Sequence, residues 1–185
     1  MKTYRLNLTL CLLFFILLFT SQDALSAKTN ESIDELFSKG NELFDQGEYE
    51  KAVSYYDKVL KIDPNDIDAL FWKGVALSNL GKYKDALSSF DKVLKIDPND
   101  TDTLNEKGAV FLDQGKYKDA HSYFDKALKI DPKHINALFN KGLVLDKEGK
   151  YEEAISYFDK VLKIDPDDID ALNAKKLTLE KLGKK

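Results

Sequence analysis

Apolar and polar residues follow a helical rhythm from about residue 33 to the end of the chain. Between residues 67 and 100, Leu70, Gly74 and Leu77 fall three or four positions apart, and Ala86 and Phe90 do the same further on. Residues at this spacing lie on one side of an α-helix, so the pattern predicts two amphipathic helices in this stretch.

The same pattern returns every 34 residues. Glycine, tyrosine, alanine and proline each recur at this interval, and the sequence DKVLKIDPND occurs at both 57–66 and 91–100. A fixed period of this length indicates a repeat protein. The recurring residues are Gly40, Gly74, Gly108 and Gly142; Gly47, Gly81, Gly115, Gly149 and Gly183; Tyr49, Tyr83, Tyr117 and Tyr151; Ala52, Ala86, Ala120 and Ala154; and Pro64, Pro98, Pro132 and Pro166.

The boundaries between the helices are marked in the same way in each unit. The glycine before each tyrosine favours a tight reversal, because glycine readily adopts the backbone conformation that ends a helix. An Asp-Pro pair closes the second helix, since the residue before proline is pushed out of the helical region. The acidic residues that follow, such as Asp66 and Asp100, are expected to cap the next helix.

One hairpin of this kind cannot bury its apolar side alone, whereas a stack of hairpins can. The final segment, 169–182, repeats only the first helix of a unit. Lys176 stands there at the place of a recurring glycine, and no second helix follows that would need a small residue. We interpret this segment as a solvating cap.

The units resemble the tetratricopeptide repeat. Counted from the first residue of a unit, that family has glycine at positions 8 and 15, tyrosine at 17, alanine at 20, an aromatic residue at 24 and proline at 32. Leucine replaces the usual tryptophan at position 4, and lysine replaces the usual leucine at position 7. Neither departure threatens the fold, since a lysine stem can lie along an apolar surface. The second unit carries the pattern as Gly74, Gly81, Tyr83, Ala86, Phe90 and Pro98.

The resemblance implies an all-α fold, a right-handed superhelix of four helical hairpins followed by a C-terminal capping helix. The predicted organisation is a signal peptide at 1–27, a linker at 28–32, repeat units at 33–66, 67–100, 101–134 and 135–168, and a capping helix and tail at 169–185.

The resemblance also implies where a partner binds. In the family the first helices line a concave groove, and positions 2, 5, 9, 12 and 13 face it. Aromatic residues on such a surface are common anchors of binding energy, so we expect an extended or helical protein segment, apolar with some Lys or Arg. The alternative, that these phenylalanines only pack between neighbouring helices, stays open. The predicted groove residues are Phe37, Asn41, Phe44, Phe71, Val75, Asn79, Asn105, Leu112, Phe139 and Leu143.

The start of the chain has the three-part layout of a secretory signal peptide. Basic residues precede an apolar run at 10–19, and small residues follow, so cleavage after Ser26 and cleavage after Ala27 are both acceptable. The run is short for a membrane span, which needs about 20 apolar residues, so an uncleaved membrane anchor is the less favoured alternative. We therefore expect export, to the periplasm, the cell envelope or the medium.

Composition narrows the class of partner. The chain has 28 basic and 32 acidic residues, a net charge of -4, and Arg5 as its only arginine. Nucleic-acid binding is not expected, because it usually requires a basic patch rich in arginine. Membrane contact is expected only through an uncleaved N-terminal segment. The leading function is a non-catalytic protein-interaction scaffold or adaptor, and the alternative is a self-associating structural component of the cell envelope.

No catalytic site, metal site or cofactor is predicted. His121 and His134 occupy non-equivalent repeat positions with no nucleophile recurring beside them, and we interpret both as surface histidines. The Asp-Pro turns lack the glycine and glutamate that a calcium loop requires. Asn30 and Asn99 each begin a glycosylation acceptor sequence, and the sequence does not decide whether either is used.

Overall fold

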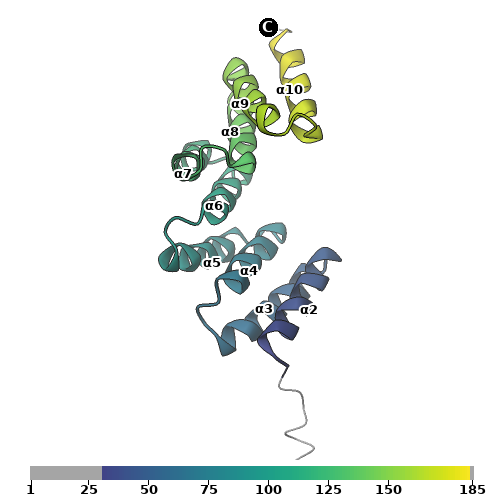
Figure 1. The fold of residues 1–185 in the computed structure, drawn as a ribbon, viewed down its shortest axis with the longest axis vertical. Coiled ribbons are helices and arrows are strands. Elements are labelled where there is room, and N and C mark those ends of the chain that lie inside the picture. Colours follow the sequence, from purple (N-terminus) through teal and green to yellow (C-terminus); the bar gives the residue numbers. More distant parts are fainter. Residues whose placement is uncertain (1–30, 184–185) are drawn as a thin grey trace, which may run out of the picture.

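A computed structural model describes residues 31–183, and within that range the chain forms nine α-helices and no strand (Figure 1). The predicted all-α fold is confirmed. The predicted signal peptide at 1–27, its two cleavage positions and Asn30 lie outside the described residues. The helices are α2 (Ile33–Asp45), α3 (Tyr49–Ile62), α4 (Ile67–Asn79), α5 (Tyr83–Ile96), α6 (Thr101–Asp113), α7 (Tyr117–Ile130), α8 (Ile135–Lys147), α9 (Tyr151–Ile164) and α10 (Ile169–Leu182).

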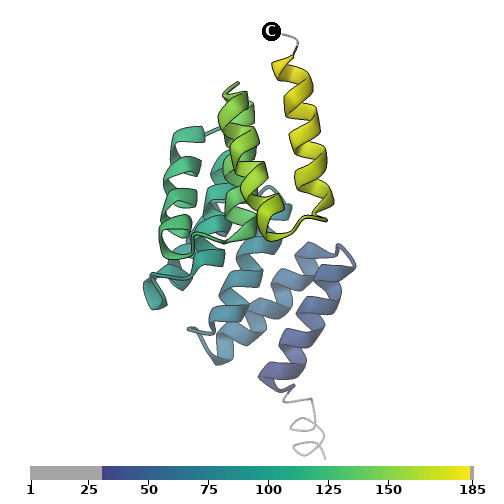
Figure 2. The same ribbon diagram turned by 45° about the horizontal axis from the view of Figure 1, so that its top comes forward.

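Consecutive helices pack as hairpins that stack into an elongated array (Figures 1 and 2). α2 packs with α3, α4 with α5, α6 with α7 and α8 with α9, and α10 packs on α9. From α4 onward, each first helix also contacts the second helix of the hairpin before it, so the joints between units are formed mainly by helices that are consecutive in the sequence.

The first helices begin at side-chain caps. Asp66 Oδ1 accepts a hydrogen bond from the backbone N–H of Ala69 at 2.7 Å, and Asp100 Oδ1 accepts one from Thr103 at 2.6 Å. These bonds satisfy amides that the helix itself leaves without a partner. The predicted capping by Asp66 and Asp100 is therefore confirmed, and Asp168 caps α10 in the same way.

The first helices end at a left-handed glycine. Gly47, Gly81, Gly115 and Gly149 have φ angles of 76°, 70°, 69° and 76°, which residues with a Cβ atom rarely adopt. The following second helices end immediately before the Asp-Pro pairs, as the sequence predicts.

Each hairpin closes where a glycine of the first helix meets a ring of the second. A Cβ atom added to Gly74 would lie 2.5 Å from Cε1 of Phe90, and one added to Gly108 would lie 2.4 Å from Cε1 of Phe124. Both rings are fully buried. Only glycine therefore allows the two helices to approach this closely.

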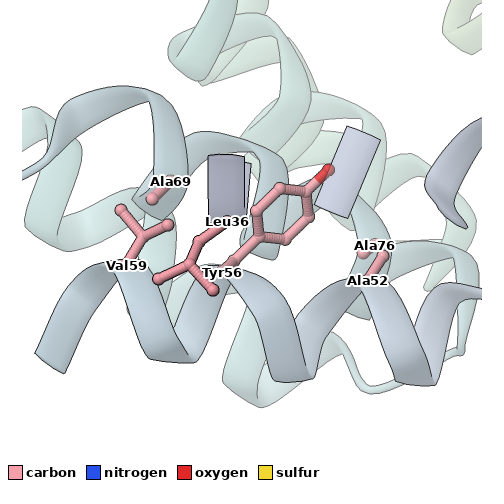
Figure 3. Packing of buried hydrophobic residues seen from close by; sticks show 6 residues of the cluster. All are labelled: Leu36, Ala52, Tyr56, Val59, Ala69 and Ala76. Atoms are coloured by element: carbon pink, nitrogen blue, oxygen red, sulfur yellow. The ribbon is translucent and has the colours of Figure 1, made fainter. Parts of the chain in front are cut away.

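The first hairpin uses a tyrosine at the ring position. Tyr56 is fully buried, and its hydroxyl donates a hydrogen bond to Asn41 Oδ1 at 2.8 Å. Burial, with a smaller contribution from Asp45, raises the pKa of Tyr56 to about 12, so the hydroxyl remains a donor at neutral pH. Figure 3 shows the surrounding core of Leu36, Ala52, Tyr56, Val59, Ala69 and Ala76.

The first helices form the inner layer of the array. α4 contacts α6, α6 contacts α8 and α8 contacts α10, whereas no two described second helices contact each other to that extent. A stack curves toward the layer whose members lie closer together, and this curvature creates an extended concave surface. We call the concave side formed by α2, α4, α6, α8 and α10 the inner face.

The lysines at position 7 close the joints between units. From the second unit onward, each pairs with an aspartate that lies 16 residues earlier, on the second helix of the preceding unit. Lys39, in the first unit, pairs with Glu31 instead. Lys107 and Lys141 are only 6% and 9% exposed, so their stems replace the usual leucine as packed side chains. The pairs are Lys73–Asp57, Lys107–Asp91, Lys141–Asp125 and Lys175–Asp159.

The last helix is less polar than the predicted solvating cap. Leu172 and Leu179 of α10 are each 47% exposed, whereas their equivalents Leu70 and Leu77 are 1% and 5% exposed beneath α5. Lys176 occupies the glycine position between them. The side of α10 that a second helix would cover is therefore partly apolar and open.

Candidate functional site

Phenylalanine at position 5 marks the inner face in three units. Each of these side chains is half-buried, because part of its ring lies against the buried ring at position 24 of the same unit. The sequence left open that these phenylalanines only pack between helices. Such packing accounts for one part of each ring, and the rest of the ring is accessible. The ring centroids are 5.8 Å apart for Phe37 and Tyr56, 6.1 Å for Phe71 and Phe90, and 5.7 Å for Phe139 and Phe158.

An aromatic cluster joins the first two units. Phe44 lies edge-on to Trp72 with ring centroids 5.2 Å apart, and Trp72 lies edge-on to Phe71 at 5.6 Å. Trp72 is missing from the predicted groove because its position, 6, was not assigned to that surface. Its contacts with two predicted groove residues place it in the same cluster.

Four further predicted residues are accessible to different degrees. Val75, Leu112 and Leu143 are half-buried, and Asn79 is exposed with its amide donating to the Val75 carbonyl at 3.0 Å. Their role in binding a partner stays a prediction.

Two asparagines of the predicted groove form hydrogen bonds within the fold. Asn41 accepts the hydrogen bond from the Tyr56 hydroxyl and is half-buried. Asn105 is only 2% exposed, and its Oδ1 accepts a hydrogen bond from Asn140 Nδ2 at 3.0 Å. Asn105 therefore does not lie open on the inner face, because it links α6 to α8.

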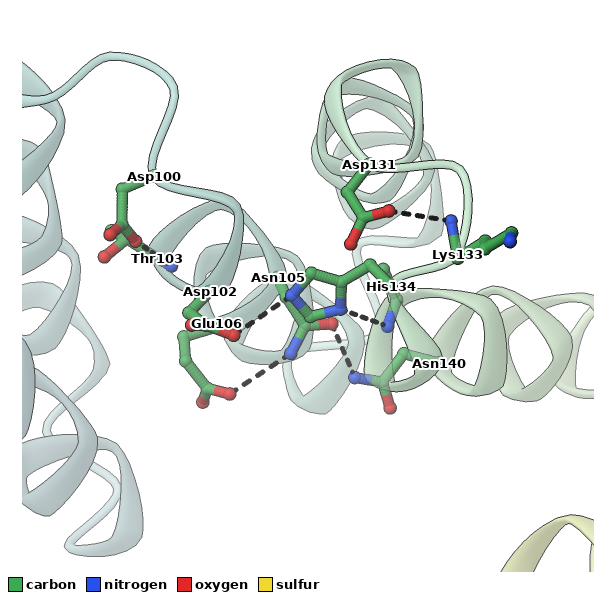
Figure 4. Close-up of polar contacts among 10 residues, drawn as sticks. Asp100, Asp102, Thr103, Asn105, Glu106, Asp131, Lys133, His134 and Asn140 are labelled. Carbon is green, nitrogen blue, oxygen red and sulfur yellow. Dashed lines mark hydrogen bonds and ion pairs between the residues drawn. The ribbon is translucent and has the colours of Figure 1, made fainter. Parts of the chain in front are cut away.

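A polar cluster surrounds Asn105 at the joint between the third and fourth units (Figure 4). Asn105 Nδ2 donates to Glu106 Oε1 at 3.2 Å. His134 Nδ1 accepts from the backbone N–H of Ala137 at 3.2 Å, which leaves Nε2 to donate to Asp102 Oδ1 at 3.0 Å. These bonds replace the ring packing that phenylalanine provides at position 5 of the other units.

The inner side of α6 is acidic. Burial raises the pKa of the Glu106 carboxyl; the hydrogen bond from Asn105 opposes this shift, and the carboxylates of Asp102 and Asp113 add to it. Burial also raises the pKa of Asp113. Both shifts indicate negative charge held where water solvates it poorly, and a bound cation would relieve that cost.

Both histidine side chains contact other residues of the fold. His134 caps α8 and its side chain is only 9% exposed, so its interpretation as a surface histidine is wrong. His121 Nε2 lies 3.0 Å from Glu148 Oε2, and its side chain is 20% exposed. Within residues 31–183 no three His, Cys, Asp or Glu side chains come together as a metal site, and no helix is long and apolar enough to span a membrane.

Comparison with family models agrees with the period. Models of the tetratricopeptide repeat match residues 67–100 and 105–169, and a third model, described as a TPR repeat, matches residues 40–81. The matches together take in most of the chain. The chain belongs to the tetratricopeptide repeat family. Proteins of this fold typically act as non-catalytic interaction scaffolds, whose repeats present a binding surface.

Several solved structures are similar to this TPR protein. MamA from Desulfovibrio magneticus is 27% identical over 84% of this chain and 93% of its own, with a TM-score of 0.66. YrrB, described as a TPR protein with an unusual peptide-binding site, is 27% identical over 85% and 80%, with a TM-score of 0.60. PilF from Pseudomonas aeruginosa is 25% identical over 84% and 71%, with a TM-score of 0.73. A search of curated proteins found no match.

Proposed function

We propose that this TPR protein is an exported scaffold whose inner face binds a segment of another protein, apolar with basic residues. The observation that carries this proposal is the row of half-buried phenylalanines, Phe37, Phe71 and Phe139, on the concave layer of helices. A concave surface with partly exposed aromatic anchors favours an extended or helical ligand. The peptide-binding site named for YrrB supports the same use of the fold.

The charge of the inner face supports the basic character of the ligand. In the first three units, positions 2, 5, 6, 9, 12 and 13 of the first helices hold six acidic residues and no lysine. Opposite charge on the ligand would speed association and favour the correct partner. The acidic residues are Asp34, Asp45, Asp68, Asp102, Glu106 and Asp113.

The test is selection from a displayed random-peptide library with the full-length protein, followed by calorimetry on the selected peptides. Enriched sequences should combine apolar residues with Lys or Arg, and their affinity should fall as salt concentration rises. A variant with Phe37→Ala, Phe71→Ala and Phe139→Ala should bind them roughly tenfold more weakly or worse. Circular dichroism would confirm that this variant still folds.

A matched variant tests the location. Ile96, Ile130 and Ile164 are 42%, 44% and 40% exposed, and each is the last residue of a second helix, whereas the inner face is formed by first helices. Their joint replacement by alanine removes as many apolar side chains and should leave peptide affinity unchanged. Equal losses in the two triple variants would place the binding surface elsewhere.

Export needs a separate test. The N-terminal region would be fused to a reporter enzyme that is active only outside the cytoplasm, and the mature protein would be analysed by mass spectrometry. A mature chain that begins at Ala27 or Lys28 supports cleavage of the signal peptide. Intact Met1 with reporter activity would support the membrane anchor, and an inactive reporter would exclude export.

Self-association is the second candidate function, and the open side of α10 favours it. Leu172 and Leu179 are exposed there, whereas α2 presents Glu35, Lys39 and Glu42 at the other end of the array. An apolar end and a polar end favour tail-to-tail pairing over an open chain of copies. Sedimentation over a range of concentrations should show a dimer that Leu172→Ser with Leu179→Ser abolishes.

A further inference from the structure

The second unit lacks a tyrosine that the other three units share. Position 23 is Tyr55, Tyr123 and Tyr157 in the first, third and fourth units, but Ser89 in the second. Ser89 is 6% exposed, and its hydroxyl donates to the Asp85 carbonyl at 3.2 Å. The small side chain leaves space at the joint between the first two units.

That space is a surface cavity of about 290 Å³, which we call the Ser89 pocket. Its walls come from α3, α4 and α5, and none of the predicted groove residues lines it. The volume is at the lower limit for a ligand site, so the pocket suits one ring and not a larger molecule. The lining residues are Val53, Asp57, Lys73, Leu77, Asp85, Ser88, Ser89 and Lys92.

The third unit shows what fills the equivalent space. Tyr123 stacks on Phe111 with ring centroids 5.4 Å apart and an angle of 15° between the planes. Lys107 Nζ lies 4.7 Å from the Tyr123 centroid, and Lys126 Nζ lies 4.6 Å from it. The ring is thus held by one apolar contact and two cation–π contacts.

The second unit keeps this setting without the ring. Lys73, Lys92 and Leu77 occupy the positions of Lys107, Lys126 and Phe111, and all three line the Ser89 pocket. Leucine at the stacking position is compatible with a tyrosine, because the fourth unit combines a leucine at this position with Tyr157.

At the joints between units, the lysine at position 7 is more exposed where the tyrosine is missing. Lys39 lies outside this comparison, because no unit precedes it, and it is 48% exposed. Lys107 and Lys141 are 6% and 9% exposed in the two following units that carry a tyrosine. Lys73 is 24% exposed, although it makes the same ion pair, with Asp57 at 2.5 Å. An aromatic ring in the Ser89 pocket would cover Lys73 as Tyr123 covers Lys107.

The acidic lining favours a neutral ring. Burial raises the pKa of Tyr157, and the carboxylates of Asp125 and Glu153 add to the shift. Asp57 and Asp85 stand at the equivalent positions in the Ser89 pocket. A phosphorylated or carboxylated ring would meet these carboxylates, and Lys73 is already paired with one of them.

We propose that the Ser89 pocket receives an unmodified tyrosine side chain from a partner protein, in the arrangement that Tyr123 has between two lysines in the third unit. The single-ring size and the open position on the surface fit a side chain presented by another chain. This second site is separate from the inner face, so its test does not depend on peptide binding there.

The first experiment titrates p-cresol, the tyrosine side-chain analogue, into full-length protein labelled with ¹⁵N. The amide signals of Leu77, Ser88 and Ser89 should shift with a dissociation constant of order millimolar, because so small a ligand makes few contacts. Ser89→Ala keeps the pocket open and should retain the shifts. The absence of specific shifts at these amides would overturn the proposal.

Two variants close the pocket by different routes. Ser89→Tyr restores the tyrosine of the other units, so it should abolish p-cresol binding and also raise the melting temperature by filling the cavity. Ser88→Trp blocks the entrance from an exposed position and should abolish binding even if Ser89→Tyr folds poorly. Unchanged p-cresol shifts in either folded variant would show that the ligand binds elsewhere.

The second experiment identifies the source of the ring. Blocked tripeptides with tyrosine, leucine or phosphotyrosine between two glycines would be titrated in the same way. The tyrosine peptide should shift the same amides, and the other two should bind about tenfold more weakly, since they lack the neutral ring that cation–π contacts require. Binding of p-cresol without the tyrosine peptide would overturn the partner-protein source and assign the pocket to a free aromatic molecule.

Discussion

Replacing Gly108 with alanine should destabilise the protein, although alanine favours helices more than glycine does. Helix propensity alone would stabilise the variant by about 1 kcal/mol. The new Cβ atom, however, would lie 2.4, 2.7 and 2.9 Å from three carbons of the Phe124 ring. Phe124 is fully buried, so it has little room to move, and overpacking of this kind costs about 1 to 3 kcal/mol. We expect a net loss of up to about 2 kcal/mol, because the clash more than offsets the helix preference.

Urea unfolding followed by circular dichroism would measure the loss, with a double-mutant cycle to assign its cause. In a Phe124→Leu background the clash disappears, so Gly108→Ala should become neutral or stabilising. Lys176→Ala, at the same repeat position of α10 with no ring opposite, should change stability by less than about 0.5 kcal/mol. A stabilising effect of Gly108→Ala in the original background, or the same effect in both backgrounds, would refute the reasoning.

Four further substitutions test buried or half-buried polar groups and their partners. Thr103 is fully buried and its hydroxyl has no hydrogen-bond partner. Thr103→Val should therefore raise the urea midpoint and increase the free energy of unfolding by about 1 kcal/mol. Glu106→Gln should stabilise the protein at pH 7 but not at pH 4. Folding raises the pKa of the Glu106 carboxyl, so the protein loses stability as the pH rises above the pKa of this group in the unfolded chain. Equal effects of the substitution in thermal melts at both pH values would contradict this. Lys107→Met should be neutral or stabilising in the same urea assay, whereas Asp91→Asn should destabilise, because it leaves the buried ammonium without its carboxylate.

The period alone predicts most of the fold, because the residues that repeat are those that decide helix ends and helix approach. Gly81 ends a helix through its positive φ, and Gly74 meets Phe90 where the sequence spaces them 16 residues apart. The joint between units was harder to foresee, since we expected the stem of the position 7 lysine to lie along an apolar surface but did not predict its ion pair with the preceding unit. Its signal was nevertheless present, as an aspartate 16 residues before each of these lysines, such as Asp57 before Lys73.

The candidate site was predicted less completely. Phe71 could be assigned from its repeat position, but burial of Asn105 depends on Asn140, which lies 35 residues further on and belongs to another unit. His134 could have been recognised as a helix cap, because it stands where other units have aspartate. The Ser89 pocket needs three helices around it, so position 23 alone shows a substitution and not a cavity.

The lysine–aspartate pairs also bear on how such an array can change length during evolution. The pair is the same at every joint. Loss of residues 67–100 would therefore bring Lys107 against Asp57, in the place where Lys73 pairs with that aspartate now. Duplication or deletion of whole units thus leaves a lysine–aspartate pair at each joint. The bond between Asn105 and Asn140 occurs at only one joint in the described chain, so separation of the third and fourth units would break it without a replacement.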